Sequence, residues 1–264
     1  MAKLIQYPRI LLAVAMALTT GFTHADISPV IQIFTGGLDG KGELTTSLHV
    51  NGTPQGITSG SYPGEIMNGG GVRITPELSY GLLESVEGSL YLPVVVDEHG
   101  QWNVAGGIGR LTWVPIEAPD EGGWFLGTTW AFSDYNWKYS QATLNLNGGF
   151  TAGYDDDDWL LVINAFLNWG LNDRYQSSNV PGLEPAFAAK HYFGENLTLG
   201  FEYYGAIGPI AHPEPIQLQS HTIFATIDWD EEDWSINFGI GRGLTRETDD
   251  WTIKSILFVP IGNY

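Results

Sequence analysis

Residues 143–171 read TLNLNGGFTAGYDDDDWLLVINAFLNWGL and contain two alternating segments on either side of a run of aspartates. From position 159 to 171 an apolar side chain recurs at every second position, with Asn164 and Asn168 on the opposite parity. Before the aspartates, Phe150 and Ala152 are apolar, whereas their neighbours of opposite parity are polar or glycine. Successive side chains of a strand point to opposite faces, so the stretch predicts a hairpin of two strands, each with one apolar face.

The four aspartates, Asp155–Asp158, fall in the predicted turn of this hairpin. Calcium-binding loops space their oxygen ligands around a glycine, which an uninterrupted acidic run does not do. We interpret the run as a solvated charged turn, similar to Asp230–Asp233 and Pro119–Glu121, with weak divalent-cation binding as the alternative. We expect no dedicated metal site and no cofactor.

The same alternation recurs through most of the chain and defines the predicted fold. Such segments of eight or more residues are long enough to cross a bilayer when tilted, and short and long connections alternate between them. A soluble β-sandwich is the alternative, although its strands are usually shorter. We predict an all-β protein, a closed antiparallel transmembrane β-barrel of the outer-membrane type with about 12 strands, and a bulge near Gly109–Arg110 where the phase slips. The predicted strands are 43–50, 71–81, 86–96, 101–115, 123–132, 141–153, 159–171, 183–193, 197–207, 220–229, 234–244 and 251–261.

The N-terminus has the pattern of a secretory signal peptide. Lys3 and Arg9 precede a short apolar run, and a small-residue cleavage site ends at Ala25. We therefore expect a signal peptide at 1–25, a segment at 26–42 that is periplasmic or a plug, and the barrel at 43–264. Export and barrel pattern together predict the outer membrane of a Gram-negative envelope, with outer-membrane lipid as a partner.

Charge and cysteine content exclude several classes of protein. The signal peptide holds two of the 11 basic residues and none of the 30 acidic ones, which leaves the mature chain at a formal −21. Such acidity argues against a nucleic-acid partner. The chain has no cysteine, so its stability must come from packing and hydrogen bonding.

Charged and tyrosine side chains on the polar faces are the candidate lining of a pore. A lipid-facing Arg or Lys at mid-bilayer would cost about 2–4 kcal/mol, which favours inward placement. These groups are expected mainly to form interior ion pairs and also to select solutes. The candidates are Arg73, Glu77, Glu87, Tyr91, Arg110, Glu184, Lys190, Glu202, Tyr204, Asp228 and Lys254.

Aromatic side chains cluster at the ends of the predicted strands, where outer-membrane barrels carry interfacial girdles. The candidates are Trp124, Tyr154, Trp159, Trp169, Trp229, Trp234 and Trp251.

No motif in the sequence indicates an enzyme. The Gly-x-Ser-x-Gly pattern is absent. Ser220 and His221 are adjacent, so on a strand they would point to opposite faces. We predict no catalytic residues, and an outer-membrane lipid-modifying enzyme remains as the third hypothesis.

Short stretches resemble one known family of barrels. ELSYGLLESVEGSLYLPVVV (77–96), Glu184–Pro185 and Glu202–Gly205 are similar to outer-membrane barrels of the "MetA-pathway of phenol degradation" family. The resemblance implies a transporter-like or channel-like outer-membrane protein, without a phenol substrate for this chain.

The leading hypothesis is therefore a channel that lets small solutes, among them aromatic or other small organic compounds, cross the outer membrane. A non-conducting structural or adhesive barrel is the second hypothesis.

Overall fold

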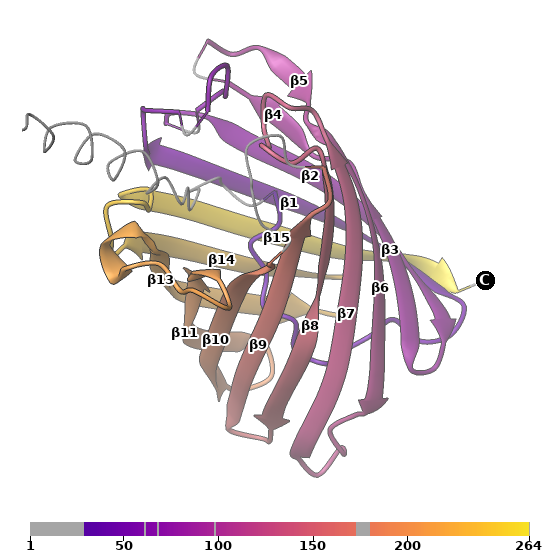
Figure 1. The fold of residues 1–264 in the computed structure, drawn as a ribbon. Helices are drawn as coiled ribbons and strands as arrows, with labels where there is room; N and C mark the ends of the chain where they lie inside the picture. Colours follow the sequence, from indigo (N-terminus) through magenta and orange to yellow (C-terminus); the bar gives the residue numbers. More distant parts are fainter. Residues whose placement is uncertain (1–28, 61, 68, 98, 173–179, 264) are drawn as a thin grey trace, which may run out of the picture.

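The computed structural model describes residues 29–60, 62–67, 69–97, 99–172 and 180–263, and the predicted signal peptide lies outside them. The described residues form one antiparallel sheet that curls into a barrel (Figure 1). Its strands are β1 (Glu43–Gln55), β2 (Val72–Leu83), β3 (Val86–Tyr91), β4 (Val94–Val96), β5 (Trp102–Val104), β6 (Gly106–Ile116), β7 (Gly123–Tyr135), β8 (Leu144–Asp155), β9 (Trp159–Gly170), β10 (Gly182–Phe193), β11 (Leu197–Ala206), β12 (Gly208–Pro209), β13 (Ser220–Glu231), β14 (Trp234–Gly243) and β15 (Trp251–Asn263).

The sheet closes because β1 pairs with both of its neighbours. Leu48 lies opposite Leu257 of β15 on one side and opposite Pro76 of β2 on the other. Three barrel strands are interrupted, namely β3 with β4, β5 with β6, and β11 with β12, so the fifteen segments make twelve barrel strands. The predicted closed antiparallel barrel of about twelve strands is confirmed. Closure removes the free edges that an open sheet would leave unpaired.

The predicted bulge at Gly109–Arg110 is wrong in position. The pairing of β3 with β6 runs through both residues without a shift. The alternation changes phase earlier, at Ala105 and Gly106: Val104 is exposed, whereas Arg110, Thr112 and Val114 of β6 point inward. Gly106 has φ 159°, and Ala105 donates its N–H to the Pro93 carbonyl oxygen at 2.8 Å, so the chain steps sideways there.

The two faces of the barrel differ sharply in polarity. Phe150 and Phe201 are 67% and 61% exposed, whereas the adjacent Thr151 and Glu202 are 2% and 1% exposed. The exterior is thus apolar and the interior polar, the arrangement of a barrel that faces lipid. Among the described residues, no helix has the length and hydropathy needed to cross a membrane.

The connections separate by length between the two ends of the barrel. The end that carries Glu43 and Asn263, here called the turn rim, has connections 84–85, 117–122, 156–158, 194–196 and 232–233. The opposite end, the loop rim, has connections 56–71, 97–101, 136–143, 171–181, 207–219 and 244–250. The β4–β5 hairpin extends the sheet at the loop rim, which accounts for the short connection at 97–101 (Figure 1).

The aspartate run forms a tight turn at the turn rim. The Asp156 carboxylate accepts hydrogen bonds from the backbone N–H groups of Asp158 and Trp159, at 2.9 and 2.8 Å. These donors lower the pKa of Asp156 because they stabilise its charged form. The turn is therefore ordered by its own backbone, and the described residues contain no group of three or more His, Asp or Glu side chains able to hold a metal ion.

Residues 29–42 run through the barrel interior and leave it at the turn rim. We call residues 29–40 the interior segment. Asn164 of β9 brackets Phe34: its amide donates to the Phe34 carbonyl oxygen at 3.0 Å and accepts from the Phe34 N–H at 2.9 Å. Near the rim, Asp39 donates its N–H to Glu87, and Gly42 donates to the Gly81 carbonyl oxygen. The segment therefore uses lumen side chains as the partners that a strand ladder would otherwise provide.

Closure of the barrel can be tested with cysteine pairs, because the chain has no native cysteine. In the Leu48→Cys/Leu257→Cys protein the two residues lie directly opposite each other. Opposed residues have Cα atoms about 4.5–5.5 Å apart, within disulfide range. We expect oxidation to join the first and last strands, seen as altered mobility of the unfolded chain on non-reducing gels. The Leu48→Cys/Leu199→Cys protein should not cross-link; efficient joining of that pair instead would contradict the strand order.

Candidate functional site: the barrel lumen

One group of charged side chains gathers around Arg110 on the inner face of β1, β2, β3 and β6. The Arg110 Nη2 donates to Glu77 at 2.8 Å, to Glu87 at 3.0 Å and to the Ser89 hydroxyl at 2.9 Å. His49 Nε2 lies 2.8 Å from the other oxygen of Glu77. We call these five residues the Arg110 cluster. Two carboxylates share one guanidinium, so the cluster is anionic unless His49 is protonated.

The Arg110 guanidinium is also enclosed by aromatic rings. Its central carbon lies 5.0 Å from the ring centres of both Phe34 and Tyr91. Aromatic faces stabilise a cation in this position. The interior segment thus contacts the Arg110 cluster through Phe34, which fixes the guanidinium between a residue of the barrel and a residue of the segment.

A second group gathers around Glu202 on β10, β11, β13 and β15. Lys190 lies 3.0 Å from Glu202 and 2.8 Å from Asp228, and Lys254 bonds the other oxygen of Glu202. Tyr204 donates its hydroxyl to Glu202 at 2.6 Å. Lys254 and Glu202 are 0% and 1% exposed, and the two lysines balance the two carboxylates of this Glu202 cluster. Buried charges are tolerated when they are paired in this way.

The remaining two lumen candidates stand apart from both clusters. Arg73 is 3% exposed, and its guanidinium lies 5.9 Å from the centre of the Tyr139 ring in the 136–143 connection. Glu184 accepts hydrogen bonds from the side-chain amides of Asn147 and Asn168, both at 3.1 Å. All the lumen candidates thus lie on the inner face: eight belong to the two clusters, Tyr91 packs against Arg110, and Arg73 and Glu184 stand apart. Their part in selecting solutes stays a prediction.

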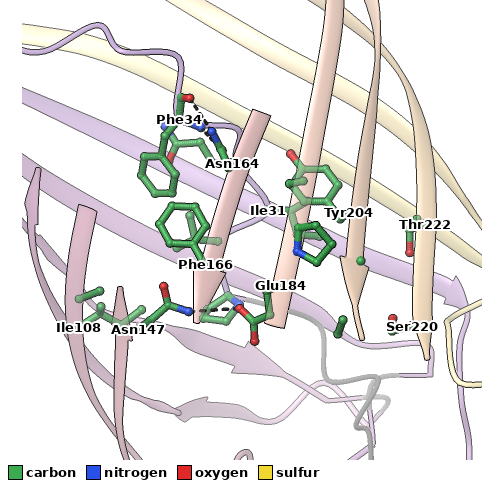
Figure 2. A pocket seen from close by; sticks show the side chains of 18 of the residues that line it. Ile31, Phe34, Ile108, Asn147, Asn164, Phe166, Glu184, Tyr204, Ser220 and Thr222 are labelled. Atoms are coloured by element: carbon green, nitrogen blue, oxygen red, sulfur yellow. Dashed lines mark hydrogen bonds between the residues drawn. The ribbon is translucent and has the colours of Figure 1, made fainter. Parts of the chain in front are cut away.

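The interior segment divides the lumen into two cavities. The loop-side cavity, of about 410 Å³, is lined by Tyr204 and Glu184 among others, whereas the turn-side cavity, of about 300 Å³, is lined by Glu77 and Glu87. Three residues line both cavities: Gln32, Phe34 and Arg110. Phe34 and Arg110 therefore form the partition between the two halves of the lumen. Figure 2 shows Phe34 beside Asn164 and Phe166, facing the loop-side cavity.

Apolar packing also anchors the interior segment. Ile33 is 5% exposed and packs against Phe125, Val162 and Ala188 on the inner face of β7, β9 and β10. The Phe34 ring lies 5.4 Å from the Phe166 ring, centre to centre. These contacts give one wall of the lumen an apolar surface.

Sequence reasoning missed two parts of this site. His49 has the same parity in β1 as the buried Ser47 and Asn51, a signal that could have placed it on the inner face. On β9, Val162 and Phe166 alternate with Asn164 on the inner face. The nearly continuous apolar run of this strand is the sequence signal of a strand covered on both faces.

The candidate girdle residues lie near the strand ends. Five are near the turn rim, among them Trp124, whose ring meets that of Tyr154 at 5.3 Å. Trp169 and Trp251 lie near the loop rim, and Trp169 stacks on Trp130 at 6.5 Å. The remaining three near the turn rim are Trp159, Trp229 and Trp234. Their role as a lipid girdle stays a prediction.

Ser220 and His221 do not form a catalytic pair. Ser220 lines the loop-side cavity, whereas the ring of His221 bonds Tyr203 at 2.6 Å and Gln219 at 2.9 Å. The two side chains thus diverge, as expected for neighbours on a strand.

Comparison with known proteins relates this geometry to solved barrels. The sequence matches no protein-family model. It matches no curated protein either. In structure the chain is similar to an outer membrane channel from Pseudomonas putida F1, with a TM-score of 0.60 over 88% of this chain and 100% of that chain, at 12% identity. It is also similar to the KdgM porin in complex with disordered oligogalacturonate, with a TM-score of 0.56 over 83% of this chain and 99% of that chain, at 8% identity.

The fold is a closed antiparallel β-barrel similar to those of these two outer-membrane proteins. At these identities the likeness establishes the architecture and leaves open the solute and the MetA-pathway resemblance.

The Glu202 cluster gives a direct test of the interior charge balance. Glu202→Gln removes the anion that Lys254 bonds and leaves that ammonium buried without a carboxylate. Breaking a buried pair in this way costs about 3–5 kcal/mol. We therefore expect the free energy of unfolding to fall by about the same amount. The measurement is a denaturant titration in which heat-modifiable gel mobility reports the folded fraction.

The control for this experiment is Glu195→Gln in the exposed 194–196 turn. Surface changes of this kind usually stay within about 0.5 kcal/mol. Equal stability of the two variants would show that the Glu202 cluster is not a buried ion network.

Proposed function

We propose that this protein is a channel of the outer membrane through which small, partly apolar organic solutes pass. The observation that carries the proposal is the divided lumen. An exterior of exposed apolar side chains fits a bilayer, and the interior holds two cavities separated by Phe34 and Arg110. A barrel that served only as a scaffold would gain nothing from cavities of a few hundred cubic ångströms.

The lining of the loop-side cavity favours amphipathic solutes. Phe166, Tyr204 and Phe224 contribute aromatic surface, whereas Asn147 and Glu184 contribute polar groups. Ligand sites commonly combine an apolar wall with a few placed polar groups. The proposal agrees with the resemblance to the MetA-pathway family and with a transport role for aromatic compounds, and it does not depend on phenol itself.

The interior segment narrows this route at Phe34. In a static lumen the ring would obstruct a solute that moves from the loop-side to the turn-side cavity. Passage then requires the ring, or the segment, to move aside. Loss of the ring should therefore open the route, whereas loss of an exterior ring should not.

Replacement of Phe34 tests the proposed route. For Phe34→Ala in planar bilayers we expect a severalfold higher mean single-channel conductance than for the unaltered protein. Phe150→Ala is the matched control, because it removes a ring that is 67% exposed on the exterior. Unchanged conductance in Phe34→Ala, with both variants folded, would contradict passage past Phe34.

Solute uptake tests the proposed class of solute. Proteoliposomes that contain the unaltered protein should take up small aromatic alcohols faster than sugars of similar mass, after subtraction of the rate in protein-free liposomes. If the uptake rate of neither solute exceeds that background and Phe34→Ala shows no conductance, the non-conducting structural barrel is the better description.

A further inference from the structure

Glu184 differs from the carboxylates of the two lumen clusters because no cationic side chain of the described residues pairs with it. Glu77 and Glu87 share Arg110, and Glu202 and Asp228 share lysines. No Lys, Arg or His side chain in the described part of the chain forms a salt bridge with Glu184. Its partners are the neutral amides of Asn147, whose bond to Glu184 Figure 2 shows, and of Asn168.

The hydrogen bonds around Glu184 suit its charged form. Asn168 donates to one oxygen and Asn147 to the other, so both oxygens act as acceptors. A carboxylate is acceptor-only, whereas a protonated carboxyl must donate from one oxygen. Each oxygen of an ionised carboxylate also keeps a free acceptor position after one such bond. The two amides thus hold a carboxylate ready to accept further donors.

An uncompensated carboxylate in a partly dry cavity favours a counter-cation. Removing a charge from water is costly unless a partner of opposite charge replaces the lost hydration. The described residues supply such partners at both clusters and none at Glu184. Among the described residues no such partner is present, so a cation that enters the cavity could take its place.

The cavity around Glu184 suits an aromatic cation better than a metal ion. Pro185, Phe166 and Tyr204 line the same cavity, together with Phe34 and Phe224. Aromatic faces attract ammonium groups and also pack against an aromatic ring. A hard metal ion would require several oxygen ligands, and no metal-binding group of three or more acidic or His side chains occurs in the described residues. The volume of about 410 Å³ is in the range of small-molecule sites.

We propose that Glu184, held by Asn147 and Asn168, binds the ammonium group of a small aromatic amine in the loop-side cavity. The ammonium group donates to the Glu184 carboxylate, and the ring of the amine packs against Phe166 and Phe34. This proposal rests on the channel function, since it names a solute class for the same lumen. Binding is nevertheless measured separately from conduction, so the two proposals fail independently.

The test compares a charged probe with a neutral probe of the same shape. Isothermal titration of the full chain in detergent at neutral pH uses 2-phenylethylammonium and 2-phenylethanol. The unaltered protein should bind the ammonium probe about tenfold or more tightly than the alcohol, the ratio expected when a charged group gains a charge-assisted hydrogen bond. Equal affinities for the two probes would overturn the proposal.

Variants locate the binding to Glu184. Glu184→Gln preserves size and should abolish the preference for the ammonium probe while leaving the affinity for the alcohol within about twofold. The control is Glu214→Gln, a carboxylate of the 207–219 connection at the same rim, which should retain the full preference. A preference that survives Glu184→Gln, or falls equally in the control, overturns the assignment.

A second variant tests the site without changing the carboxylate itself. Asn147→Ala removes one of the two amides while keeping the carboxylate, and it should lower the preference for the ammonium probe in part. Heat-modifiable mobility reports whether each variant is folded. Conductance of the same preparations is recorded in parallel. Amine binding without conduction would refute the channel and support the amine site. Conduction without a preference for the amine would refute the amine site and support the channel.

Discussion

The constraint on which the structure depends is that charge has almost no place on a lipid-facing exterior. Outward positions of the strands carry residues such as Phe150 and Phe201, so charged side chains along the strands collect in the lumen. A lumen crowded with charge must then neutralise it. The Glu202 cluster does so fully and the Arg110 cluster in part, with pairs that join strands distant in sequence, such as β11 with β15. The membrane thus determines the interior chemistry as well as the surface.

The same constraint explains how much of the fold the sequence predicts. Every lipid-facing strand must alternate apolar and polar residues. The positions of the strands and of the inward charges can therefore be predicted from local pattern alone. Local pattern does not reveal where a barrel strand is interrupted while both of its parts stay paired with the adjacent strands. Pro93 has no N–H to donate and separates β3 from β4, and the step at Ala105 separates β5 from β6. Both breaks depend on pairing across strands, which a single sequence does not display.

The site is less predictable because much of it is built by contacts between distant segments. Asn164 reads as one polar residue among several, yet it brackets the backbone of Phe34 from 130 positions away. His49 reads as isolated until β1 and β2 are aligned beside Glu77. In the sequence Glu184 resembles any other inward carboxylate. It differs because no cation of the described residues pairs with it, whereas Glu77, Glu87, Glu202 and Asp228 each have one. Such distinctions arise from the register of the whole barrel rather than from any one strand.

The interior segment changes the character of the lumen as well as its width. Barrel strands facing water contribute mainly polar groups, and the clusters around Arg110 and Glu202 are of this kind. Ile33 and Phe34 add apolar surface where Val162 and Phe166 of β9 point inward to meet them. Without the segment, those side chains would line an aqueous space at a cost of about 25 cal/mol for each Å² of exposed apolar area. The apolar inner face of β9 and the segment therefore require each other, and Phe34 supplies both the partition of the lumen and part of the aromatic wall that a passing solute would meet.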